Sequence, residues 1–239
     1  MPSRSPGAAL LDRLVAADPG RPRVTVYDDT DGPARDERVE LSARVLANWV
    51  AKAANLLQEE LDAGPGTVVR LALPPHWRTL YWALATWAVG ACVEVPDAEG
   101  AGSADVVVTD DPDRVDEAPA AVVVTLPALA RAAAVAVPAG AVDEARELAT
   151  YADVLDPWQA PGADAPALRG PEGVTRYAAL VPVPGSPGRW HTATTDTAAF
   201  LRLALEAFAA DGSVVLTRGA PTAEVLARRL EAEGVTASG

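Results

Sequence analysis

The sequence has very little lysine and cysteine. Among its 239 residues, Lys52 is the only lysine, Cys92 is the only cysteine, and the other basic residues are arginines. A single cysteine excludes an internal disulfide framework, and Cys92 lies in a short apolar segment where a buried thiol is the usual arrangement. Any reaction that needs a mobile ammonium group depends on Lys52. This residue lies opposite the apolar side of a predicted helix, so we expect a solvated surface lysine.

Metal ligands, long apolar runs and excess positive charge are also lacking. The two histidines, His76 and His191, have no ligand spacing with Cys92, so we predict no metal site and expect both to serve in packing or capping. The net charge of −13 disfavours binding to nucleic acid or to an anionic membrane. No apolar run approaches the roughly 20 residues that span a bilayer, and no signal peptide is recognisable. We therefore expect a cytoplasmic protein.

The segment from Val68 to Pro96 predicts a strand, a helix and a second strand. A β-branched apolar run at 68–73 is followed by a helix over 74–90 and by another apolar run at 91–96. The helix places four residues on one face by their spacing: Trp77, Tyr81, Leu84 and Ala88. Two strands joined by a helix in so short a segment form a βαβ unit, which predicts a parallel sheet.

The remaining patterns extend this α/β prediction along the chain. We predict a hairpin of two strands at 23–27 and 38–41 and further strands at 105–109, 121–126, 176–183 and 213–217. We predict helices at 10–15, 42–61, 126–136, 141–155, 196–210 and 221–233. Residues 156–171 are rich in proline, glycine and alanine and predict an irregular connector. Asp110, Asp111 and Asp113 follow a predicted strand, where ligands often bind, but Asp-Asp-Pro-Asp is also an ordinary turn. The turn is the favoured interpretation.

Several segments in the right order resemble the N-terminal part of the adenylate-forming (AMP-binding, acyl-CoA synthetase-like) enzymes. They are Arg-Val-Glu-Leu-Ser-Ala-Arg-Val-Leu at 38–46, Ala-Ala-Asn-Leu-Leu at 53–57, Gly-Pro-Gly-Thr-Val-Val-Arg-Leu-Ala-Leu-Pro at 64–74, Ala-Leu-Ala-Thr-Trp-Ala-Val-Gly-Ala-Cys-Val-Glu-Val-Pro at 83–96 and Asp-Gly-Ser-Val-Val-Leu at 211–216. A Glu-x-x-Gly-Val-Thr segment at 231–236 also fits. The resemblance covers about half of the chain and implies one α/β domain over 1–239, with a mostly parallel sheet flanked by helices.

The same resemblance implies where nucleotide chemistry would reside. The family's phosphate loop, which ends in Pro-Lys-Gly, would fall between 97 and 210, where this chain has no lysine. The nearest substitutes are Gly-Ala-Gly-Ser at 100–103, Pro-Gly-Ser-Pro-Gly-Arg at 184–189 and Thr-Ala-Thr-Thr at 192–195. The adenine-contacting motif, the ribose-binding aspartate and the lid with its catalytic lysine would lie beyond Gly239. We accordingly predict no catalytic residue, no metal and no ATP or AMP cofactor.

These observations favour a truncated, non-catalytic relative of the adenylate-forming enzymes. It would act as a scaffold or binding protein for a protein partner or for a small acyl or nucleotide ligand. Two alternatives stay open. One is a residual enzyme in which Arg189 and a helix N-terminus near Thr195 bind a phosphate-bearing substrate. The other is a subunit of a split adenylating enzyme whose second polypeptide carries the lid.

Overall fold

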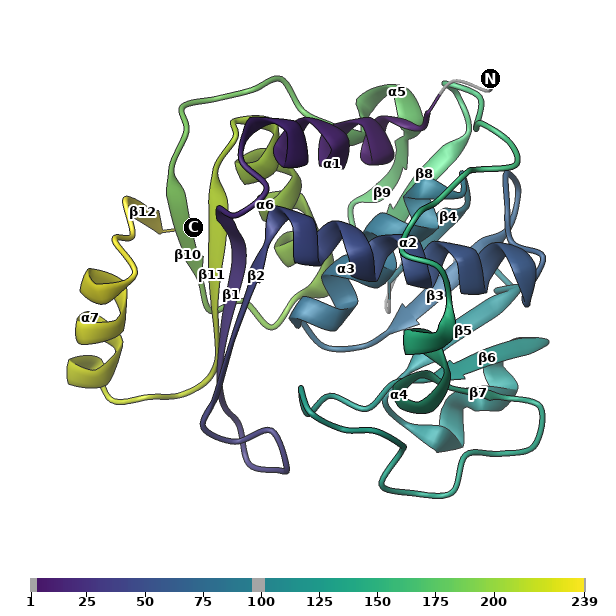
Figure 1. Cartoon of the computed structure of the whole chain (residues 1–239), viewed down its shortest axis with the longest axis horizontal. Coiled ribbons are helices and arrows are strands. Elements are labelled where there is room, and N and C mark those ends of the chain that lie inside the picture. Colours follow the sequence, from purple (N-terminus) through teal and green to yellow (C-terminus); the bar gives the residue numbers. More distant parts are fainter. Residues whose placement is uncertain (1–3, 96–101, 239) are drawn as a thin grey trace.

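The computed structural model describes residues 4–95 and 102–238 and contains two mostly parallel sheets (Figure 1). The seven-stranded sheet has the order β7 (Val142–Asp143), β6 (Ala120–Val123), β5 (Val106–Thr109), β3 (Val68–Ala72), β4 (Cys92–Glu94), β8 (Pro166–Gly170) and β9 (Gly173–Arg176). The five-stranded sheet has the order β12 (Ala237–Ser238), β10 (Arg189–Thr192), β11 (Ser213–Gly219), β1 (Pro22–Asp29) and β2 (Glu37–Ser42). Only the β8–β9 and β1–β2 pairs of the described strands are antiparallel. The predicted α/β class is confirmed.

Helices cover and separate these sheets. They are α1 (Pro6–Ala17), α2 (Ala43–Glu59), α3 (Trp77–Ala88), α4 (Glu144–Glu147), α5 (Tyr177–Leu180), α6 (Thr197–Ala209) and α7 (Ala223–Ala232), with 3₁₀ turns η1 (Pro112–Glu117) and η2 (Leu148–Thr150). Side-chain oxygens of Ser42 and Asp196 accept hydrogen bonds from the first turns of α2 and α6, which explains where these helices begin. Among the described residues, no helix is long and apolar enough to cross a membrane.

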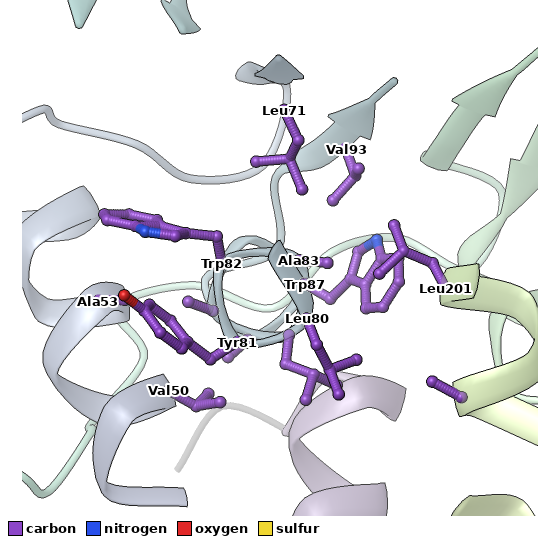
Figure 2. Packing of buried hydrophobic residues seen from close by; sticks show 14 of the residues in the cluster. Val50, Ala53, Leu71, Leu80, Tyr81, Trp82, Ala83, Trp87, Val93 and Leu201 are labelled. Carbon is purple, nitrogen blue, oxygen red and sulfur yellow. The ribbon is translucent and has the colours of Figure 1, made fainter. Parts of the chain in front are cut away.

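Helix α3 lies at the centre of the molecule. All of its residues are buried, so the helix is enclosed on every side and not only along the predicted face of Trp77, Tyr81, Leu84 and Ala88. Figure 2 shows Tyr81 directed toward α2, Trp87 directed toward Leu201 of α6, and residues of β3 and β4 covering a third side. One cluster of buried apolar side chains extends through α3 and includes residues of both sheets. The predicted βαβ unit is confirmed, since β3 and β4 are parallel neighbours joined by α3.

Two of the predicted helices were wrong. Residues 126–136 form no helix, and 141–155 contain only β7, α4 and η2. Side chains from distant elements bind the backbone of both segments. Arg78 donates to the carbonyls of Leu126 (3.3 Å) and Pro127 (3.0 Å), and Lys52 donates to the carbonyl of Ala149 (2.8 Å). These bonds replace helical ones, and they also show that Lys52 is tied to the backbone rather than free in solvent.

The connector and the following strand also differ from the prediction. Strand β8 occupies 166–170 within the predicted connector 156–171. The predicted strand at 176–183 is instead the end of β9 and the short helix α5. The buried Tyr177 explains this change, because its hydroxyl donates to the carbonyl of Ala91 (2.7 Å) and draws the chain against the end of α3. Strand β10 was not predicted, and it extends the five-stranded sheet beyond β11.

Candidate functional site

A cleft of about 490 Å³ lies at the carboxyl ends of β3, β4, β5 and β8, against the N-terminus of α6. Ligands commonly bind at this position in open α/β sheets, because loops leaving the strands diverge there. Its walls combine apolar side chains with three charged ones. The lining residues are Ala72, Leu73, Pro74, Val95, Asp110, Arg114, Pro171, Thr195, Asp196, Thr197 and Ala198. We refer to this space as the first cleft.

The charged groups of the first cleft leave an excess of carboxylate. Asp110 directly follows β5, and burial raises the pKa of its carboxyl group. Arg114 is already paired, since its Nε and Nη2 atoms donate to Glu117 at 2.6 and 3.0 Å. Asp196 caps α6 by accepting a hydrogen bond from the backbone of Ala199 (3.1 Å). The capped helix end and the paired arginine offer little to an anion, whereas a neutral or cationic group fits this environment.

A second cleft, of about 440 Å³, opens between the β1–β2 hairpin and residues 123–135. It shares Asp110 with the first cleft, so the two sheets converge there. Its only described lining arginine, Arg218 of β11, forms an ion pair with the buried Asp28 of β1. Asp28 also accepts a hydrogen bond from the backbone of Thr30 (3.0 Å). The positive charge of the second cleft is therefore neutralised within the protein.

The wall of the second cleft depends on a buried ion pair that the sequence patterns did not predict. Arg78 of α3 and Glu144 of α4 are both buried, with Arg78 Nη1 at 2.9 and 3.1 Å from the Glu144 carboxylate oxygens. The hydroxyl of Tyr81 donates to the same carboxylate. Because Arg78 also binds the carbonyls of Leu126 and Pro127, this pair holds the lining segment in place. In the sequence, Tyr81 falls on the predicted face of α3, but nothing in the pattern indicates that Arg78 is buried beside it.

The three predicted aspartates separate in the structure. Asp110 lines both clefts, but Asp111 accepts a hydrogen bond from the backbone of Asp113 (3.0 Å) and caps η1. The favoured turn interpretation thus describes Asp111 and Asp113. Among residues 4–95 and 102–238, no group of three or more histidine, cysteine or acidic side chains could hold a metal ion.

Arg189 and Thr195 are not brought together. Arg189 begins β10, where its Nη2 donates to Thr25 (2.9 Å) and its guanidinium forms an ion pair with Glu233. Thr195 follows the opposite end of β10 and lines the first cleft. The hypothesis that these two residues share one phosphate was therefore wrong.

The predicted phosphate-loop substitutes have other arrangements. Residues 184–188 have no regular structure, and at 192–195 the hydroxyl of Thr192 accepts from the backbone of Thr194 (3.2 Å). The first two residues of the segment 100–103 lie outside the described residues.

The remaining candidates are buried. Burial raises the pKa of the Cys92 thiol to about 11, so the thiolate is scarce at neutral pH and the predicted buried position is confirmed. His76 caps α3, because its Nδ1 accepts from the backbone of Arg78 (3.3 Å), and burial lowers its pKa. His191 lies 3.1 Å from the hydroxyl of Thr217, and burial lowers its pKa as well. Both histidines thus have the capping or packing roles expected for them.

Comparison with solved structures identifies the class of fold. The chain aligns over 99% of its length with an acyl-CoA synthetase of Brucella canis (TM-score 0.74, 18% identity) and with an acetoacetyl-CoA synthetase of Streptomyces lividans (TM-score 0.71, 18% identity). It also aligns over 99% with the N-terminal subdomain of NpsA from Klebsiella oxytoca in complex with 3-hydroxybenzoyl-AMSN (TM-score 0.63, 16% identity). The chain thus has the fold of the N-terminal domain of adenylate-forming enzymes, as the sequence resemblance implied.

The chain spans 47% and 44% of the two synthetases and 60% of the NpsA subdomain. Among curated proteins, a "TIGR03089 family protein" of Mycobacterium tuberculosis (strain ATCC 25618 / H37Rv) is 39% identical over 164 residues. That alignment covers 64% of this chain and 63% of the relative. The relative's name states a family and no activity. No family model matches the chain.

Proposed function

We propose that this chain is a binding protein that keeps the scaffold of adenylate-forming enzymes without their nucleotide chemistry. Its ligand would be a small molecule with an apolar body and a neutral or cationic polar end, held in the first cleft. The observation that carries this proposal is the charge of the cleft: Asp110 and Asp196 line it, while Arg114 is bound to Glu117. Leu73, Pro74 and Val95 would contact the apolar part of such a ligand.

The same charges argue against a triphosphate in either cleft. Phosphate sites in proteins combine free backbone N–H groups with unpaired cations, and phosphoryl or adenylyl transfer needs charge neutralisation in the transition state. The arginines that line the two clefts, Arg114 and Arg218, are each paired with a carboxylate of the chain. Lys52, the only lysine, donates to the carbonyls of Ala149 and Tyr151.

We expect no change in thermal unfolding when millimolar Mg-ATP or AMP is added to the protein. A ligand at a hundredfold excess over its dissociation constant stabilises the native state by about 2.7 kcal/mol, which a melting curve resolves readily. Equal concentrations of Mg-tripolyphosphate serve as the control for ionic effects. A clear, nucleotide-specific increase in the melting temperature would contradict the proposal. It would instead favour a nucleotide-using enzyme, acting alone or with a second polypeptide.

The first cleft can be tested with two probes of equal size and opposite charge, n-butylammonium and n-butyrate. We expect n-butylammonium to shift the backbone NMR signals of Asp110 and Ala198 at lower concentration than n-butyrate does, because carboxylates line the cleft. Thr195→Trp fills the cleft from its exposed edge and should abolish the shifts. Ala193→Trp, on an exposed position outside the lining, is the matched control. Equal binding of the probes, or binding that survives Thr195→Trp, would refute this ligand class.

A further inference from the structure

Several charged groups attach helix α7 to the five-stranded sheet. No residue of α7, all of which is described, is fully buried, and Figure 1 shows the helix standing apart from the central layers. Val24 and Val26 of β1 face the apolar core, so the alternate residues Thr25 and Tyr27 lie on the outer face of the sheet. Arg229 of α7 joins this face through Asp29, with an Nη2–Oδ1 distance of 2.9 Å. The guanidinium of Arg229 also lies 4.5 Å from the ring centre of Tyr27.

Glu233, at the C-terminal end of α7, makes the densest of these contacts. Its side chain is only 7% exposed. Its Oε1 atom accepts hydrogen bonds from the Tyr27 hydroxyl (2.6 Å) and from Arg38 Nε (3.0 Å) and Nη2 (2.8 Å). Its Oε2 atom accepts from Arg189 Nη2. Three side chains from β1, β2 and β10 thus converge on one carboxylate group.

Two of these side chains, Arg189 and Arg38, also bind residues of the sheet, whereas Tyr27 additionally contacts Arg229 of α7. Arg189 Nη2 donates to Thr25 (2.9 Å) and its Nη1 donates to Ser213 (3.2 Å), so the guanidinium is fixed on the outer face. Arg38 donates to Glu40 at 2.7 Å. Without Glu233, two arginines would face one carboxylate, leaving one positive charge uncompensated. Such a partly buried cluster of donors is suited to bind an oxyanion.

We propose that Tyr27, Arg38 and Arg189 form an oxyanion-binding site that Glu233 occupies from within the chain. A ligand carrying a carboxylate or phosphate group would compete with Glu233, and its binding would release α7 from the outer face of the sheet. The helix itself offers Glu233 no support, because a C-terminal helix end disfavours negative charge. Burial raises the pKa of the Glu233 carboxyl, but hydrogen bonds from Tyr27, Arg189 and Arg38 outweigh burial and lower it overall.

The test uses Glu233→Ala, which empties the site, with Glu231→Ala as a matched control on an exposed position of the same helix. The probes are inorganic phosphate and acetate, measured against chloride at equal ionic strength by isothermal titration calorimetry. We expect Glu233→Ala to bind phosphate at least about tenfold more tightly than the wild type. In the wild type, phosphate can bind only in the fraction of molecules in which Glu233 has left the site, and this lowers its apparent affinity. Adding Arg189→Ala to Glu233→Ala should abolish this gain. Tighter binding of phosphate than of acetate would identify a phosphate-bearing ligand. Tighter binding of acetate would identify a ligand with a carboxylate group.

Hydrogen exchange of the wild type gives a second, variant-free measurement. If the probes compete with Glu233, phosphate should accelerate amide exchange in α7 more than chloride at equal ionic strength, while α3 remains protected. The proposal would be overturned if Glu233→Ala bound phosphate and acetate no more tightly than the wild type does. It would also be overturned if the tighter binding persisted when Arg189→Ala was added. If Glu233→Ala does not fold, unchanged α7 exchange in phosphate would overturn it. This site and the first cleft lie at opposite ends of β10, so either proposal can fail without the other.

Discussion

Replacing Glu144 with alanine is expected to lower the free energy of unfolding by about 3–5 kcal/mol, which is typical for breaking a buried ion pair. Glu144 is 1% exposed and Arg78 is 3% exposed, so the variant would leave an arginine buried without its carboxylate partner. Burial raises the pKa of the Glu144 carboxyl group, and the neighbouring Arg78 acts in the opposite direction. Urea unfolding of the purified variant measures the change.

The double variant Glu144→Ala, Arg78→Met separates the charge effect from packing. Removing both charges should restore part of the lost stability, since paired removal leaves no isolated charge. Recovery will be incomplete, because Arg78 also binds the carbonyls of Leu126 and Pro127. A loss below about 1 kcal/mol for Glu144→Ala alone would mean that water reaches the arginine easily. Glu144→Ala should also accelerate amide hydrogen exchange at Leu126 and Ala128, the residues on either side of Pro127, because Arg78 holds the wall of the second cleft there.

Replacing Trp87 with alanine is expected to cost about 3–5 kcal/mol of stability, the usual range for removing a buried tryptophan. The side chain is fully buried in α3, and its Nε1 donates to the carbonyl of Ala167 in β8 at 2.7 Å. Gly7 of α1 packs directly against this side chain, since a Cβ atom added at Gly7 would lie only 3.1 Å from the Cβ of Trp87. The variant would leave a cavity where α1, α3 and β8 meet. Chemical unfolding is again the measurement.

Two phenylalanine substitutions isolate the hydrogen bond of Trp87. Trp82 is equally buried, but among the described residues its Nε1 has no hydrogen-bond partner. Trp87→Phe should therefore be more destabilising than Trp82→Phe by about 1 kcal/mol, the net value of a typical hydrogen bond. Trp158→Ala is the control for a large side chain on the surface, since Trp158 is 57% exposed. If Trp87→Ala lowered the free energy of unfolding no more than Trp158→Ala does, the buried position of Trp87 would be contradicted.

Sequence patterns were most successful where structure depends on neighbouring residues. The βαβ unit at 68–96, the hairpin of β1 and β2, and helices α2, α6 and α7 all follow from local apolar spacing and capping residues. The strand-end position of Asp110 likewise indicated a place where a cleft could form, and the structure has one there. Family resemblance added the correct fold, because the resembling segments are those that pack the core.

Distant contacts decided what these patterns missed. Residues 126–136 have helical composition, yet Arg78, 48 and 49 positions away, binds their first carbonyls. One open alternative had Arg189 bind a phosphate-bearing substrate, but its guanidinium pairs with Glu233, 44 positions further along the chain. The helix 77–88 has an amphipathic spacing and is nevertheless buried on every side, because α2, α6 and the strands β3 and β4 surround it (Figure 2).

The sequence by itself determined the α/β class, the parallel strands and most helix boundaries, since these depend on periodicity and on capping within a few residues. Only the tertiary structure decided which charges are free. The arginines that line or support the clefts, and the one considered for phosphate binding, each form an ion pair with a carboxylate: Arg78, Arg114, Arg189 and Arg218. An ion pair forms wherever folding brings opposite charges within a few ångströms, and sequence separation imposes no limit on that distance. The chemistry available to the clefts was therefore settled by pairing across the fold.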